Sequence, residues 1–95
     1  MSELTIKRED GPTGGRYTAN SGGDVAEMTY SRAGQTRIII DHTGVPDSMR
    51  GLGVGKRLVE AAVTDARAEG VKIIPLCPFA KATLAKQPDW QDVVQ

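Results

Sequence analysis

Cysteine and aromatic residues are scarce in this chain, and neither sign of charge is in excess. One cysteine among 95 residues excludes a framework of disulfide bonds within the chain. Twelve basic residues balance 12 acidic ones, whereas domains that bind nucleic acid usually carry a basic excess. One Trp, two Tyr and one Phe are too few for a surface of stacked bases. Nucleic acid is therefore not an expected partner.

Long apolar runs are also missing. No stretch approaches the roughly 20 residues needed to span a bilayer, and the first residues, MSELTIKREDG, lack the apolar core of a signal peptide. We therefore expect a cytoplasmic protein without membrane association, in which the single thiol stays reduced. The length predicts a single domain over residues 1–95. No metal site is expected.

Alternating polar and apolar residues predict four short strands in the first half of the chain. Residues 4–9, 16–20 and 25–32 alternate with a period of two, and glycine-rich turns separate them. The fourth strand, over residues 36–42, contains the continuous run Ile38-Ile39-Ile40. Such a run predicts burial on both faces and a central place in the sheet.

The apolar spacing becomes helical after a glycine-rich segment. Apolar residues recur at helical intervals from Val54 to Ala66, and Gly70 is typical of the residue that ends a helix. A strand is then predicted over residues 71–76, a short helix over 79–87 and a final turn or helix over 89–95. The expected fold class is α/β, with an α+β mixed sheet. Four antiparallel strands come first, and the helix then leads by a right-handed crossover to a parallel fifth strand and short C-terminal helices.

The segment RGLGVGKRL, residues 50–58, is the main candidate for a binding site. Glycine allows close approach to the backbone, and a helix N-terminus offers free N–H groups with a partial positive charge, so the segment predicts an anion site. It is not a Walker A loop, because Arg50 and Arg57 occupy the positions of the first glycine and the hydroxyl residue. It is not a dinucleotide fingerprint, because Lys56 or Leu58 stands where the third glycine belongs.

Residues 50–55 fit the pattern [QR]-x-x-G-x-[GA], which is the pyrophosphate loop of the GNAT N-acetyltransferase superfamily. Residues 42–90 resemble the small single-domain branch of GNAT-like proteins in four segments: H-T-x-V-P, R-G-x-G, a strand ending P-x-C, and a closing P-x-[WY]. This resemblance implies a GNAT-like fold and acetyl-CoA or coenzyme A as a substrate. It also implies an amine acceptor, a small molecule or a protein, that the sequence does not name. Gly44 and Gln87 depart from residues common in the branch.

The resemblance also implies roles for individual residues. Backbone N–H groups of the loop would hold the CoA pyrophosphate, and the backbone after the fourth strand would pair with the pantetheine amides. Arg50 and Lys56 would add charge-assisted contacts, whereas Arg57 is expected at the surface. The cofactor-binding residues expected on this basis are Thr43, Gly44, Val45, Arg50, Gly51, Leu52, Gly53, Val54, Gly55 and Lys56.

Cys77 and His42 are the catalytic candidates. Cys77 follows the fifth strand and precedes a predicted helix start, where a lowered pKa would let the thiol accept an acetyl group. The alternative is a buried cysteine that only packs. His42, the one histidine, would either carry a proton near the thioester or cap a strand end. If Cys77 is inert, direct transfer needs a base, and Asp41, His42 and Glu27 are the candidates.

Two functions remain open at this stage. The first is an acetyl-CoA-dependent N-acetyltransferase. The second is a module that binds acetyl-CoA or CoA without efficient transfer, because so short a chain leaves little to build walls around an acceptor. Phe79 and Trp90 are expected in the core or over the C-terminal helix. Lys81 and Lys86 would meet the adenosine phosphate or face solvent.

Overall fold

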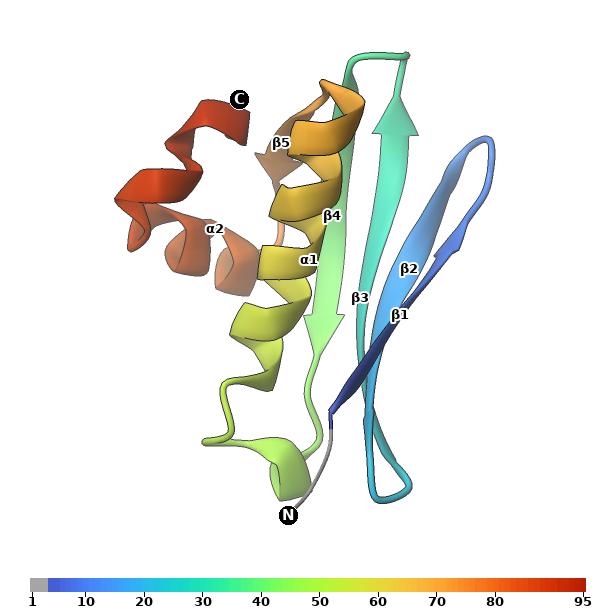
Figure 1. The fold of residues 1–95 in the computed structure, drawn as a ribbon, viewed down its shortest axis with the longest axis vertical. Helices are drawn as coiled ribbons and strands as arrows, with labels where there is room; N and C mark the ends of the chain where they lie inside the picture. Colours follow the sequence, from blue (N-terminus) through green and yellow to red (C-terminus); the bar gives the residue numbers. More distant parts are fainter. Residues whose placement is uncertain (1–3) are drawn as a thin grey trace.

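The computed structural model describes residues 4–95, which form a five-stranded mixed sheet with helices. The strands are β1 (Thr5–Asp10), β2 (Gly14–Ser21), β3 (Asp24–Ala33), β4 (Arg37–Gly44) and β5 (Lys72–Pro75). The α-helices are α1 (Val54–Glu69) and α2 (Pro78–Ala85), and two 3-10 helices are η1 (Asp47–Met49) and η2 (Pro88–Val93). Figure 1 shows α1 running along the sheet, with α2 and the C-terminal turn beside it. The predicted fold class is confirmed.

The strands lie in the sheet in chain order, β1-β2-β3-β4-β5. The first four pair antiparallel, and β5 pairs parallel with β4, with Ile74 opposite Ile39. On its other side β5 contacts the C-terminal residues, since Val94 bridges Ile73 and the Gln95 N–H donates to the Ile73 carbonyl at 2.9 Å. Helix α1 is therefore the connection between two parallel neighbours, as the sequence predicts.

One face of the sheet carries the core. The alternation predicted for β3 is confirmed, because Ala26, Met28 and Tyr30 are buried while the residues between them are not. The helix covers these side chains with an apolar stripe made of Val54, Leu58, Val59, Ala62, Val63 and Ala66. Neither α-helix of residues 4–95 is long and apolar enough to cross a membrane.

The prediction for the isoleucine run is confirmed for the place of the strand in the sheet and wrong for burial on both faces. Ile38 and Ile40 are buried, but Ile39 lies on the opposite face and is only half-buried. The buried residues of both helices join one core on the inner face, so Ile39 finds no helix above it among residues 4–95. The strand itself is interior, because β4 lies between β3 and β5 and pairs with both. An isoleucine at position 39 reflects the preference of β-branched residues for strands and the pairing of Ile39 with Ile74.

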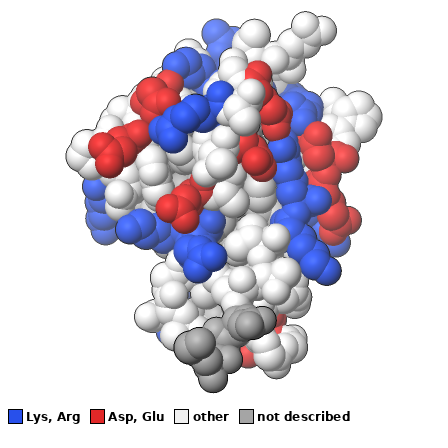
Figure 2. Space-filling model, in the orientation of Figure 1, with Lys and Arg blue, Asp and Glu red and all other residues white. Residues whose placement is uncertain are grey.

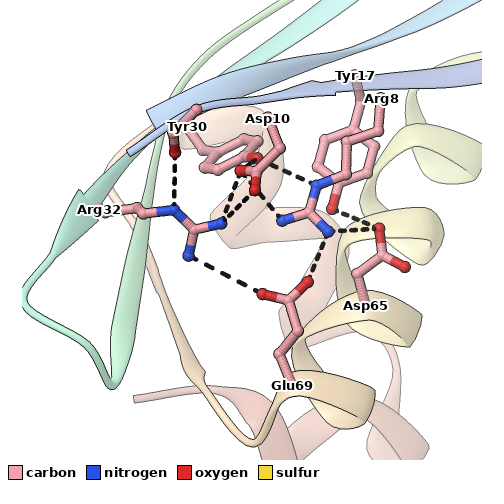
Figure 3. A network of polar contacts seen from close by, with 8 residues as sticks. Arg8, Asp10, Tyr17, Tyr30, Arg32, Asp65 and Glu69 are labelled. Atoms are coloured by element: carbon pink, nitrogen blue, oxygen red, sulfur yellow. Dashed lines mark hydrogen bonds and ion pairs between the residues drawn. The ribbon is translucent and has the colours of Figure 1, made fainter. Parts of the chain in front are cut away.

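Arg8, on β1, links the sheet to α1 (Figure 3). Its Nη1 donates to Glu69 Oε2 at 2.6 Å and to Asp65 Oδ2 at 3.3 Å. Its guanidinium carbon lies 5.4 Å from the ring centroid of Tyr17 and 5.4 Å from that of Tyr30, so the cation sits against two aromatic rings. The edge strand is thereby fixed to the helix that crosses the sheet.

Asp10 is the second centre of this network (Figure 3). It accepts a hydrogen bond from the Tyr30 hydroxyl and two from Arg32 Nη2, at 2.6 and 2.7 Å. These donors hold the pKa of the Asp10 carboxyl below its usual value. Burial and the bond to Asp10 raise the pKa of Tyr30. A carboxyl with a depressed pKa stabilises the fold above its unfolded pKa, and this contribution is lost as the pH falls through the folded pKa.

We expect Arg8→Met to lower the free energy of unfolding by about 1.5 kcal/mol, the lower end for hydrogen bonds to charged groups. The lower end applies because its carboxylate partners are about a third exposed. Methionine keeps an unbranched apolar side chain at this position. Urea denaturation measures the change. The control is Arg16→Met, whose ion pairs lie on the exposed face and whose loss should leave the midpoint nearly unchanged. Equal shifts of the midpoint in both variants would mean that the Arg8 network stabilises the fold no more than exposed surface ion pairs do.

Candidate functional site

The glycine-rich segment turns the chain from η1 into α1. Met49 anchors η1 in the core at 1% exposure, and the Arg50 N–H donates to the Asp47 carbonyl at 3.2 Å. Gly51 and Gly53 have φ angles of 83° and 71°, in the left-handed region that side chains disfavour. Gly53 is the N-cap residue of α1. The backbone conformation therefore requires glycine at positions 51 and 53.

No side chain of residues 4–95 caps the first turn of α1. Gly53 has no side chain to cap it, and the first turn holds no acidic residue. Within residues 4–95, the N–H groups from Gly51 to Lys56 make no backbone hydrogen bond. Free N–H groups at the positive end of a helix dipole suit a bound anion.

A pocket of about 510 Å³ opens beside this turn. It lies between the glycine-rich segment, the end of β4 and helix α2. The lining residues are Thr43, Val45, Met49, Arg50, Gly51, Gly53, Val54, Gly55, Lys56, Phe79, Thr83, Lys86 and Gln87. Most of the residues expected to bind the cofactor therefore meet in one cavity. Gly44 and Leu52 do not line it, and Leu52 is 60% exposed.

The charge of the pocket has one sign. Arg50, Lys56 and Lys86 line it, and no carboxylate among residues 4–95 does. Arg50 Nε also contacts Asp47 Oδ1 at 3.0 Å in an exposed pair. On the face drawn in Figure 2, by contrast, basic and acidic side chains are interspersed.

Phe79 closes one side of the pocket by packing on Gly55. A Cβ atom at Gly55 would lie 2.6 Å from Phe79 Cε2, closer than real Cβ contacts come. Gly55 has no positive φ, so the aromatic ring, and not the backbone, requires glycine here. Phe79 is 43% exposed, so it is not a core residue, and its ring forms a wall of the pocket. A sequence shows no contact between residues this far apart, so this role was not predicted.

Cys77 is the N-cap residue of α2 and lies against β4. The N–H groups of Leu76 and Cys77 both donate to the Ile40 carbonyl, at 3.2 and 3.1 Å. The Cys77 Sγ atom lies 3.5 Å from Thr43 Oγ1, and the residue is 6% exposed. Because Thr43 lines the pocket, the sulfur is one side chain beyond the pocket wall.

The surroundings of the Cys77 thiol favour its ionised form. Burial raises the pKa, but the backbone N–H groups of Ala80 and Phe79 and the Thr43 hydroxyl lower it by more, and the net pKa lies below its usual value. The first turn of α2 supplies the N–H groups, as the sequence predicts for a thiol at a helix start. The arrangement can stabilise a thiolate.

A β-bulge at Asp41 decides which side chains of β4 face the thiol. Tyr30 pairs with Ile40 and Thr29 pairs with His42, so Asp41 has no partner in the register. His42 is exposed and does not line the pocket, and Asp41 accepts a hydrogen bond from the Ser31 hydroxyl at 2.6 Å. Glu27, the remaining candidate base, is bonded to Arg16. The structure thus brings Thr43 and Cys77 together, without His42.

The fold and this site define an α+β protein with a candidate anion site at the start of its crossover helix. A family model of GCN5-related N-acetyl-transferases matches residues 16–93. The chain therefore belongs to the GCN5-related N-acetyltransferase family.

Solved structures and a curated relative agree with this assignment. A GCN5-like protein from Staphylococcus aureus, solved by NMR, is 41% identical, with a TM-score of 0.75 over 100% of this chain and 91% of that chain. The IAA acetyltransferase from Bacillus cereus is 21% identical over 75% of this chain and 63% of its own, with a TM-score of 0.63, and shares the fold. Protein NATD1 of Xenopus tropicalis is 31% identical over 65 residues. That match covers 68% of this chain but only 60% of the relative.

Proposed function

We propose that this protein binds acetyl-CoA, with the pyrophosphate on the N–H groups of the first turn of α1, and transfers the acetyl group to an amine. The main observation behind this proposal is the N-terminus of α1, which no side chain of residues 4–95 caps. It lies beside a pocket that is lined by cations and, among residues 4–95, by no carboxylate. Membership of a family that generally uses acetyl-CoA supports this donor. The acceptor is a small molecule or a protein with a free amine.

Cys77 is proposed to carry the acetyl group between donor and acceptor. Its thiolate attacks the carbonyl carbon of acetyl-CoA, a new carbon–sulfur bond forms, and the bond to the CoA sulfur breaks. The departing CoA thiolate takes the proton that Cys77 lost on ionisation. An amine then attacks the new thioester and loses a proton, which gives an amide and restores the Cys77 thiol. Thr43 stabilises the thiolate and lies between the sulfur and the pocket.

The second candidate function is a CoA-binding module without efficient transfer. It is favoured by the positions of His42 and Asp41, which do not line the pocket. If Cys77 does not accept the acetyl group, the pocket offers an incoming amine no carboxylate or histidine base among residues 4–95. The two functions share the CoA site and differ in the labelling of Cys77.

Calorimetric titration with CoA and with pantetheine tests the binding site. We expect Lys56→Ala to weaken CoA binding about fivefold, because a charge-assisted contact to phosphate is lost. Its affinity for pantetheine, which has no pyrophosphate, should not change. The matched control is Arg57→Ala, since Arg57 is the next residue of α1 and lies outside the pocket. Equal losses for both ligands, or for both variants, would place the pyrophosphate elsewhere.

A further inference from the structure

Helix α2 forms a second wall of the pocket, opposite the first turn of α1. Phe79, Thr83 and Lys86 all line the pocket, and their spacing of four and three residues places them on one helical face. Lys81 is on the same helix but does not line the pocket. The helix therefore turns one cation toward the cavity and another away from it.

The cations of the pocket fall into two groups. Arg50 and Lys56 belong to the glycine-rich segment and the start of α1, where the free N–H groups lie. Together with those N–H groups they can match the charge of a pyrophosphate. Lys86 follows α2 on the facing wall, and no carboxylate of residues 4–95 lines the pocket to neutralise it. Lys86 is thus available to a second anionic group of the same ligand.

The ring of Phe79 fixes how the two walls face each other. It packs on Gly55 at the first turn of α1, and Lys86 follows seven residues later, about two helical turns along α2. One end of α2 approaches Thr43 through Cys77. The other end, with Lys86, lies away from the proposed thioester. A ligand with its reactive end at Cys77 and its pyrophosphate on α1 therefore has its remaining portion available to Lys86.

CoA differs from dephospho-CoA by a phosphate monoester on the ribose 3′ oxygen. This group carries a charge of about −1.5 to −2 at pH 7 and three strong acceptor oxygens. A lysine ammonium is a compact cation with three donors, which suits a monoester at the edge of a pocket. We propose that Lys86 contacts the ribose 3′-phosphate and makes the site selective for CoA over dephospho-CoA. This inference rests on the proposed function.

Calorimetric titration of the full chain with CoA and with dephospho-CoA tests the selectivity. We expect the native protein to bind CoA about tenfold more tightly than dephospho-CoA, because one charge-assisted contact is added. Lys86→Gln should lose most of this preference and bind dephospho-CoA like the native protein. Lys81→Gln is the matched control, the same change on the other side of the same helix, and should keep the preference. Circular dichroism checks that both variants are folded.

The outcomes separate this inference from the function on which it rests. Equal affinity of the native protein for CoA and dephospho-CoA would overturn the role of the 3′-phosphate while leaving the pyrophosphate site intact. A loss of affinity in Lys86→Gln that is equal for both ligands would overturn it as well, since the contact would then lie elsewhere on the ligand. If the native protein binds neither ligand, the proposed function itself is wrong, and the inference about Lys86 falls with it.

Discussion

The Cys77→Ser protein should gain no acetyl group on incubation with acetyl-CoA, whereas the native protein should gain one that hydroxylamine removes. The chain contains a single cysteine, so a thioester can form at no other residue. Serine keeps the size of the side chain but is a far weaker nucleophile at neutral pH. Intact-protein mass spectrometry measures the label. Binding of CoA to the variant should be nearly unchanged, because the residues proposed to hold the phosphates lie elsewhere in the pocket.

The rate of labelling should rise with pH through the ionisation of the thiol. Burial raises the pKa of Cys77, but the N–H groups of Ala80 and Phe79 and the Thr43 hydroxyl lower it by more. The midpoint should therefore lie below that of a free cysteine. Thr43→Val removes one donor and keeps the shape, so it should move the midpoint upward. If Cys77→Ser still acetylates an amine at the native rate, transfer is direct and the thiol only packs.

Gly53→Val should weaken CoA binding by about 30-fold. A β-branched residue is poorly tolerated at a φ of 71°, and about 2 kcal/mol of backbone strain corresponds to roughly this change in affinity. The segment should relax away from the conformation that directs its N–H groups at the ligand, and binding must restore that conformation. Calorimetry on the folded variant measures the loss.

Gly70→Val is the matched control for this strain. Gly70 follows α1 with a φ of 72°, and a Cβ atom at either glycine would meet open space rather than a packed neighbour. The two substitutions thus disturb the two ends of one helix alike, but Gly70 lies outside the pocket. Both should lower the free energy of unfolding, and only Gly53→Val should lower CoA affinity. Equal CoA affinities in the two variants would show that CoA binds away from the start of α1.

Local pattern predicts most of the fold, because each element has its signal within a few residues. The alternation along β3 and the glycine after α1 are of this kind, and both are confirmed. The prediction for Ile39 is wrong because burial on the second face depends on whether another layer covers the sheet. The network of Arg8 was not predicted, since its partners on α1 are 57 and 61 residues away.

The candidate site divides in the same way. The anion-binding segment is continuous in sequence and is recognisable from its glycines, whereas the wall supplied by Phe79 and Thr83 depends on how α2 docks. The bulge at Asp41 shows most clearly which part of the site the sequence does not predict. Side chains alternate along a strand, so without the bulge His42 would share the inner face with Ile40. One extra residue moves His42 outward and Thr43 inward, and nothing in the sequence marks that residue.

The contacts of the C-terminal residues with β5 bear on the behaviour of the protein in concentrated solution. A bare outer strand displays unpaired amide and carbonyl groups on which another chain can add a strand. Here Val94 bridges Ile73, the Lys72 ammonium donates to the Asp92 carbonyl, and Arg37 Nε donates to Gln95 Oε1 at 3.1 Å. The C-terminal residues thus cover the outer edge of β5. We expect that loss of these contacts would leave the β5 edge open to pairing with a second chain.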